Sequence, residues 1–512
     1  MTTAAEFDAA VARRWFLGTL MATLVFRVWL SAVTPLTGDE AYFLVWGQQL
    51  AVGYYDHPPM VGWLLALLAP LSLHEWVLRL PSVLLPVALA LGTRRALARW
   101  FGVAQPSADL AAVLVLLVPM NVWNVLITTD TPLILFSFAA IVLFARAAQR
   151  QWLAGFFLAG VFLGFAFLSK YFAVLLGLGM IAWALVRRGG GARWSALGLV
   201  FLGALPAGLL NLHTNFEACW SNVMFNAINR HEGAGFGWTN PLLFIASLAY
   251  LAAPLLWYAW RERRGLVAEF ADPGTRALVF AWLVPFAVFA LLSPVKKIGL
   301  HWLLSFIPPL VLTLAIALPS GKLLRCAKFF AAFAVLHGLV AVVAAALPLE
   351  TWKSNRMYSR LVLQFRTPQV VEKLAPYNKD YVLATDNYTL SSILSYYAGQ
   401  YFFVFGAGTS HARHDDIVTD VRRFDGRNIL IVRRDPPPEQ DYRPYFKSIE
   451  VRPVEVSGTT IHLVLGHGFD YKAYREGVLK QVRDRWYRIP AGLPIGRCYY
   501  CEKYFSGESC GR

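Results

Sequence analysis

Residues 277–294 read ALVFAWLVPFAVFALLSP, an apolar run without a charged side chain. Wound as an α-helix, such a run is about as long as the hydrocarbon core of a bilayer is thick. Comparable runs recur along the 512-residue chain, which is 57% hydrophobic and only 15% charged. Because backbone polar groups in lipid must find partners within the protein, these runs predict transmembrane helices. The sequence therefore predicts a polytopic α-helical membrane protein.

About eleven segments are long and apolar enough to be assigned as spans. The first contains Arg27 and is longer than the apolar core of a signal peptide, so it is interpreted as an uncleaved span. The expected spans are residues 15–35, 77–97, 108–127, 132–147, 152–169, 171–186, 195–212, 241–259, 277–294, 303–319 and 328–347.

The distribution of basic residues predicts the orientation of these spans. The chain has 47 Lys and Arg against 31 Asp and Glu. One set of alternate connections, which includes residues 94–99, 187–193 and 261–276, holds most of the loop Lys and Arg. The positive-inside rule places this set in the cytoplasm, together with the N-terminus. This explains the basic excess better than nucleic-acid binding does, and an odd number of spans leaves the C-terminus outside.

Residues 348–512 have a different pattern. Short β-branched and aromatic runs predict strands at 382–386, 401–405, 428–432 and 460–465, and 389–398 predicts a helix between the first two. The expected organisation is a transmembrane domain at 1–347 and a small α/β domain at 348–512, outside the membrane.

The cysteines follow the same division. Cys326 is expected at the cytoplasmic edge as an inert thiol, whereas Cys219, Cys498, Cys501 and Cys510 fall on the outer side. In an oxidising compartment the spacing of the last three favours a disulfide among them. A zinc site would need a fourth ligand from elsewhere, so no metal site is predicted.

The outer loops carry the polar residues that could do chemistry. They contain GDEAYF at 38–43, GYYDHPPM at 53–60, TTDTP at 128–132, SKY at 169–171 and KK at 296–297. Carboxylates can take a proton from a hydroxyl, and cations can stabilise a phosphate leaving group. The loops thus predict a shared site at the membrane surface, where a lipid phosphate could bind.

Each motif also has a structural interpretation, which the sequence leaves open. Asp39 or Glu40 could cap the following helix, and Asp130 before Thr131-Pro132 has the chemistry of a helix start. Lys170, Lys296 and Lys297 could be interfacial anchors whose long side chains extend to water.

The order of these motifs resembles glycosyltransferase family 39, a group of bacterial membrane enzymes. That family shares the GT-C fold with protein O-mannosyltransferases and with the aminoarabinose transferase of lipid A, and the resemblance covers roughly residues 10–350. It implies an enzyme that takes a sugar from undecaprenyl phosphate or a similar polyprenyl phosphate. The acceptor would be an envelope glycolipid such as lipid A or its core, reached at the periplasmic face of the inner membrane, with inversion at the anomeric carbon.

The resemblance also implies roles for single residues. Asp39, with its neighbour Glu40, and Asp56 would be the catalytic carboxylates, Asp39 as general base and Asp56 as an orienting group. The donor phosphate would meet His57, where relatives carry Lys, and Arg230. Lys296 and Lys297 are further candidates for contact with this phosphate. Further substrate contacts are expected from Tyr54, Tyr55, Asp130, Lys170, His231 and His301. A need for a divalent cation is left open.

Three other functions remain as alternatives. A protein O-mannosyltransferase would use the same donor with a protein acceptor. A transporter or flippase would place polar residues near the bilayer midplane rather than at span ends. A scaffold without catalysis would not need acids and cations in so many loops.

Overall fold

The computed structural model describes residues 9–186, 191–229, 235–408 and 414–508. The chain forms two compact units. The helical unit comprises the described residues within Met1–Val33, Ser72–Leu210 and Gly233–Ala345. The α/β unit comprises those within Thr34–Leu71, Asn211–Glu232 and Ala346–Arg512. Two loop segments from the first half of the chain thus belong with the C-terminal segment.

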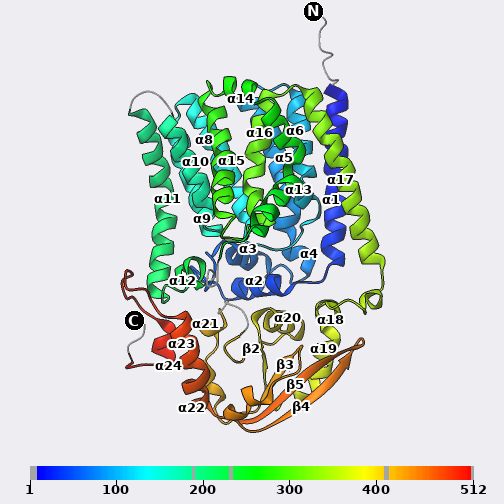
Figure 1. Ribbon diagram of the computed structural model, residues 1–512, viewed down its shortest axis with the longest axis vertical. Helices are drawn as coiled ribbons and strands as arrows, with labels where there is room; N and C mark the ends of the chain where they lie inside the picture. Colours follow the sequence, from blue (N-terminus) through cyan, green and yellow to red (C-terminus); the bar gives the residue numbers. More distant parts are fainter. Residues whose placement is uncertain (1–8, 187–190, 230–234, 409–413, 509–512) are drawn as a thin grey trace, which may run out of the picture. The chain divides into compact units, whose positions relative to one another are not determined.

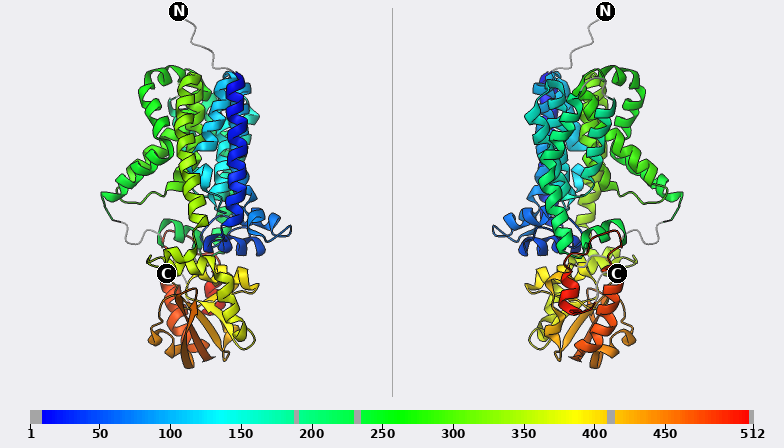
Figure 2. Two further views of the ribbon diagram at one scale, coloured as in Figure 1. Left: turned by 90° about the vertical axis from the view of Figure 1, so that its right-hand side faces the viewer. Right: turned by 90° about the vertical axis from the view of Figure 1, so that its left-hand side faces the viewer.

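Eight helices of the described chain are long and apolar enough to cross a membrane. They are α1 (Ala9–Val33), α4 with α5 (Glu75–Leu78, Leu80–Trp100), α8 (Asp130–Arg150), α11 (Ala192–Glu217), α13 (Thr239–Arg261), α15 (Pro273–Leu292), η2 with α16 (Leu300–Phe306, Ile307–Ala317) and α17 (Ser320–Ala346). Figures 1 and 2 show most of the long helices of this unit running in nearly the same direction.

Three shorter apolar helices complete the predicted set: α6 (Gln105–Leu117), α9 (Leu153–Ser169) and α10 (Ala173–Val186). Each of the eleven expected segments therefore coincides with an apolar helix, and the prediction of a multi-pass helical protein is confirmed. The segment expected at 108–127 is interrupted, because Val118 is extended ahead of Pro119 and the short α7 (Pro119–Trp123) follows. The number of membrane crossings stays a prediction. The remaining helix of this unit is α14 (Arg263–Glu269).

Burial separates the inner helices of this unit from the outer ones. Most of α8 and of the η2–α16 span is buried, and every residue of α6 from Ala108 to Leu117 is buried. In contrast, only Leu323, Cys326, Ala327 and Phe330 of α17 are buried, and much of its apolar surface is exposed. An apolar surface of that size is typical of a lipid-facing helix.

The α/β unit contains a five-stranded sheet with strand order β2-β1-β3-β5-β4. β1 (Val382–Thr385) pairs in parallel with β2 (Phe403–Val404) and β3 (Ile429–Arg433). β5 (Thr459–Phe469) runs antiparallel to β3 and forms a hairpin with β4 (Phe446–Val456). Ser457 and Gly458 turn this hairpin with positive φ at both positions, as a type I′ turn requires. Figure 1 shows β4 and β5 as a long twisted ribbon.

The predicted strands and the helix α20 (Tyr388–Ala398) are confirmed, but β4 was missed. β4 is an edge strand, most of its side chains are outside the core, and it contains Pro453. It therefore lacks the apolar run that marks a buried strand.

The other elements of this unit are short. They are α2 (Gly38–Gln48), α3 (Met60–Leu68), α12 (Ser221–Ala227), η3 (Leu349–Trp352), α18 (Tyr358–Phe365), α19 (Thr367–Leu374), η4 (Ala375–Tyr377), α21 (Asp415–Val418), η5 (Val421–Phe424), η6 (Glu439–Asp441), η7 (Arg443–Tyr445), α22 (Tyr471–Tyr474), η8 (Arg475–Leu479), α23 (Lys480–Trp486) and α24 (Tyr499–Tyr504).

Candidate active site

Asp39 lies in the first turn of α2 with its side chain exposed. Thr37 is the N-cap of this helix, and its hydroxyl accepts a hydrogen bond from the backbone N–H of Glu40. The Glu40 carboxylate in turn accepts the Thr37 backbone N–H at 2.9 Å, which completes a capping box. The capping alternative is therefore correct for Glu40 alone. Glu40 fixes the start of the helix, and Asp39 is left facing outward.

The carboxylate of Asp39 has one described partner, which comes from far along the chain. The Tyr388 hydroxyl, at the start of α20, donates to Oδ1 of Asp39 at 2.8 Å. The two residues are 349 positions apart. A tyrosine donor leaves the second carboxylate oxygen available to accept from a substrate hydroxyl.

Asp56 is buried, in contrast, and is held from several sides. The Tyr42 hydroxyl donates to its Oδ1 at 3.0 Å, and Asn226 of α12 donates to its main-chain carbonyl at 2.8 Å. Asn222, one turn earlier on α12, donates to the carbonyl of Tyr54 at 3.0 Å. The segment ahead of Pro58-Pro59 is thereby fixed by side chains as well as by the prolines.

The two tyrosines that donate hydrogen bonds to Asp39 and Asp56 are in contact with each other. The rings of Tyr42 and Tyr388 make an edge contact, with centroids 4.8 Å apart. Burial, and after it the negative charge of Asp56, raises the pKa of Tyr42 well above its ordinary value. Tyr42 therefore stays protonated and keeps donating to Asp56. The motifs predicted that Asp39 and Asp56 act together. In the structure they are connected through Tyr388 and Tyr42, whose rings touch.

Aromatic rings support the segment that carries Asp56. Tyr54 stacks on Trp46 with ring centroids 4.5 Å apart, and its hydroxyl donates to the Trp46 carbonyl. Tyr55 is completely buried. His414 packs edge-on against Tyr54 at 5.3 Å, and burial lowers its pKa to about 3, so its ring is neutral. Substrate contact by Tyr54 and Tyr55 stays a prediction. In the structure both side chains are buried and pack within the segment that carries Asp56.

His57 is partly buried and its Nε2 lies 3.9 Å from Oδ2 of Asp56. The phosphate contact of His57 stays a prediction.

A second polar cluster lies in the helical unit. Lys170 donates to both carboxylate oxygens of Asp130, at 2.8 and 2.9 Å, and both residues are buried. The His301 Nε2 atom lies 3.9 Å from Oδ2 of the same aspartate. Asp130 is thus not the N-cap, a position that Thr129 occupies, and Lys170 is an ion-paired residue rather than an interfacial anchor. The three residues, predicted separately, lie together.

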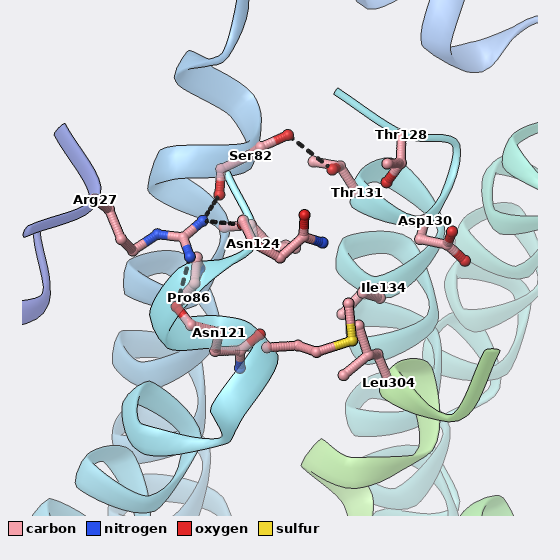
Figure 3. A pocket seen from close by; sticks show the side chains of 12 residues that line it. Arg27, Ser82, Pro86, Asn121, Asn124, Thr128, Asp130, Thr131, Ile134 and Leu304 are labelled. Atoms are coloured by element: carbon pink, nitrogen blue, oxygen red, sulfur yellow. Dashed lines mark hydrogen bonds between the residues drawn. The ribbon is translucent and has the colours of Figure 1, made fainter. Parts of the chain in front are cut away.

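Beside this cluster, Arg27 crosses to the neighbouring helices (Figure 3). Its guanidinium donates to the main-chain carbonyls of Ser82, Val83, Asn121 and Asn124. The Ser82 hydroxyl continues the chain of hydrogen bonds to Thr131, next to Asp130. Arg27 therefore has bundle-facing partners, as a charge inside a membrane protein requires, and it braces the pocket that Asp130 helps to line.

The remaining predicted phosphate ligands follow α15 or fall outside the described residues. Lys296 is partly buried and Lys297 is exposed, both just after α15. Arg230 and His231 fall outside the described residues. Among the residues that are described, no group of three or more His, Cys, Asp or Glu is placed to hold a metal ion.

The sequence favoured a disulfide among the tail cysteines and left its pairing open, and Cys498 pairs outside the tail. This residue forms a disulfide with Cys219, 279 positions earlier, rather than with its neighbours in the tail. Cys501 is also disulfide-bonded, Cys510 falls outside the described residues, and Cys326 is a buried free thiol, as expected. Sequence spacing favoured a local pair, but the fold brings the end of α11 next to the tail: the Cys219 N–H donates to the Arg497 carbonyl.

Removing this disulfide is expected to destabilise the α/β unit by about 2–4 kcal/mol, because it joins two distant segments of that unit. Replacing Cys219 and Cys498 by Ala should lower the unfolding midpoint followed by tryptophan fluorescence in detergent. The matched control is Cys326→Ala, which removes a thiol without a cross-link. Equal midpoints for the wild type and the double variant would contradict the expectation.

The chain is similar to known membrane proteins in sequence and in fold. A family model for dolichyl-phosphate-mannose-protein mannosyltransferases matches residues 56–212. Lipid A galacturonosyltransferase RgtD of Rhizobium johnstonii is 28% identical over 309 residues, which is 55% of this chain and 62% of that protein. The match thus spans less than two thirds of the curated relative.

Two crystal structures of ArnT from Cupriavidus metallidurans share the fold. The one bound to undecaprenyl phosphate has a TM-score of 0.63 at 16% identity and covers 88% of this chain and 98% of ArnT. The apo structure has a TM-score of 0.61 at 17% identity, with coverages of 89% and 98%. Part of the chain is thus similar in sequence to dolichyl-phosphate-mannose-protein mannosyltransferases and to a lipid A galacturonosyltransferase, and its fold is the GT-C fold of ArnT.

Proposed function

We propose that this protein transfers a sugar from a polyprenyl phosphate, such as undecaprenyl phosphate, to lipid A or a similar envelope glycolipid. The observation that carries the proposal is the pair of aspartates in the α/β unit. Asp39 is exposed with a tyrosine donor, and Asp56 is buried and fixed by Tyr42. The names of the relatives support the substrates, since one acts on lipid A and another was solved with undecaprenyl phosphate.

The proposed reaction inverts the anomeric carbon. An acceptor oxygen attacks that carbon, and the bond from the carbon to the donor phosphate oxygen breaks, so the electron pair leaves with the polyprenyl phosphate. Asp39 takes the proton if the acceptor is a hydroxyl. If the acceptor is a phosphate, no proton need be removed, and Asp39 positions the acceptor instead.

The proposed mechanism needs cations at the donor phosphate and a carboxylate at the acceptor. An ionised phosphate leaves without a general acid, so cations are more useful here than the paired acid and base of a glycosidase. His57, Arg230, Lys296 and Lys297 are proposed to contact the donor phosphate. Asp130, Lys170, His231 and His301 are proposed as further polar contacts. The active side is proposed to be the periplasmic face of a bacterial inner membrane, with the N-terminus in the cytoplasm.

The lipid content of the envelope tests this proposal. A deletion strain should lack one sugar on its lipid A or core in mass spectra, and the wild-type gene should restore it. An uronic acid is the first mass difference to seek, given the relative's name. Unchanged lipids together with a lost glycoprotein signal would favour a protein O-mannosyltransferase instead.

A further inference from the structure

A polar groove of about 520 Å³ lies in the α/β unit, at the carboxyl ends of the parallel strands β1 and β3. That edge of a parallel sheet is where ligands commonly bind, and the volume suits a small polar group. The groove borders the cluster that contains Asp39, because Tyr388 belongs to both. Its lining includes Arg360 of α18, Asp386 and Asn387 after β1, and Arg433, Arg434 and Asp435 at the end of β3.

The arginines that line the groove outnumber its carboxylates. Arg433 faces Asp386, with Nε 3.3 Å from Oδ2, and Arg434 binds Asp435 at 2.6 Å. Arg360 is exposed and makes no hydrogen bond or ion pair with any residue that the structure describes. Three guanidinium groups therefore face two carboxylates, and guanidinium groups bind phosphates and carboxylates with two parallel hydrogen bonds.

The start of α20 adds to this positive potential. Asn387 caps the helix by accepting the backbone N–H of Leu390, and Tyr388, Thr389 and Leu390 also line the groove. The N-terminal end of a helix carries a partial positive charge and favours anions.

The groove also adjoins Asp39. Gly38 and Tyr388 are both part of its lining, and Tyr388 is the residue that donates to Asp39. Gly38 packs so closely on α20 that an added Cβ would lie 2.6 Å from the Thr389 Cβ. A ligand in the groove is therefore held next to the proposed base.

We propose that this groove binds an anionic group of the acceptor, a phosphate ester or a carboxylate, and so selects and orients the acceptor. The proposal rests on the proposed function, because it assigns the acceptor side of the same reaction. Arg360 and Arg434 hold the anion, and Arg433 is positioned by its contact with Asp386.

Steady-state transfer by the full-length protein in nanodiscs tests this assignment. The acceptors are lipid A with its phosphates and the same lipid A after phosphatase treatment. For the phosphorylated acceptor, Arg360→Gln and Arg434→Gln should each raise KM about tenfold or more, because a charge-assisted hydrogen bond is lost, and should leave kcat nearly unchanged. For the dephosphorylated acceptor, the wild type should already show the raised KM, and the variants should add little.

Two controls separate the sources of the effect. Arg356→Gln removes an exposed arginine just before α18 that does not line the groove, and it should leave KM unchanged. Inorganic phosphate should compete only weakly, since the rest of the acceptor adds to binding. Strong inhibition by phosphate, with equal KM values for both acceptors, would assign the groove to a free anion and overturn the proposal.

The outcomes also separate this inference from the proposed function. If the wild type transfers no sugar to any acceptor, the proposed function fails. If transfer proceeds and Arg360→Gln and Arg434→Gln keep the wild-type KM, the function stands and the groove assignment is wrong.

Discussion

Asp39→Asn is expected to lower kcat for sugar transfer by a factor of about 100 or more, the usual effect of removing a general base. The substitution keeps the size of the side chain and its ability to accept from Tyr388, so the geometry of the site should survive. What is lost is the basicity of the carboxylate. The measurement is the rate at which labelled sugar moves from polyprenyl phosphate to lipid A in nanodiscs.

Two further variants serve as controls for Asp39→Asn. Tyr388→Phe removes only the neutral donor to Asp39 and should lower kcat by no more than about tenfold, the usual range for one hydrogen bond. Asp380→Asn makes the same chemical change at an exposed aspartate of the same unit and should have no effect. Full activity of Asp39→Asn would remove this residue from the catalytic assignment.

The second large effect concerns stability. Asp130→Asn is expected to destabilise the helical unit by about 3–5 kcal/mol, because it leaves the buried ammonium of Lys170 without its anionic partner. Lys170→Gln should also destabilise the unit, because it leaves the buried carboxylate of Asp130 without its ammonium partner. The measurement is the unfolding midpoint of the purified protein in detergent.

Combining the two substitutions should recover most of the loss, since a neutral amide pair needs no compensating charge. Lys322→Gln is the matched control. Its ion pair with Glu262 is partly exposed on both sides, so its loss should cost no more than about 1 kcal/mol. A double variant as unstable as the sum of the single variants would show that Asp130 and Lys170 contribute independently of each other.

The spans were predictable because each is a local property of the sequence. A run such as residues 277–294 has few alternatives to a helix in lipid, and α15 is found there. The strands β1 and β3 were equally local, as buried apolar runs. The exposed edge strand β4 has its hydrophobic residues spread along a polar segment, and a pattern based on apolar runs missed it.

The acidic residues of the candidate site were predictable from the sequence, but the side chains that donate hydrogen bonds to them were not. The motifs that contain Asp39, Asp56, Asp130 and Lys170 pointed to these residues. Tyr42 was part of the first motif, three positions after Asp39, but nothing in the sequence marked it as the donor to Asp56. Tyr388 and the Cys219–Cys498 disulfide depend on contacts between residues hundreds of positions apart, for which one sequence carries no signal.

The most direct test is transfer by the purified protein in nanodiscs supplied with undecaprenyl-phosphate-linked sugars and lipid A. The wild type is expected to move one sugar onto lipid A with inversion of the anomeric configuration, read by NMR of the product, and Asp39→Asn is expected to move almost none. Folded wild-type protein that transfers no sugar to lipid A from any donor of this class would contradict the account.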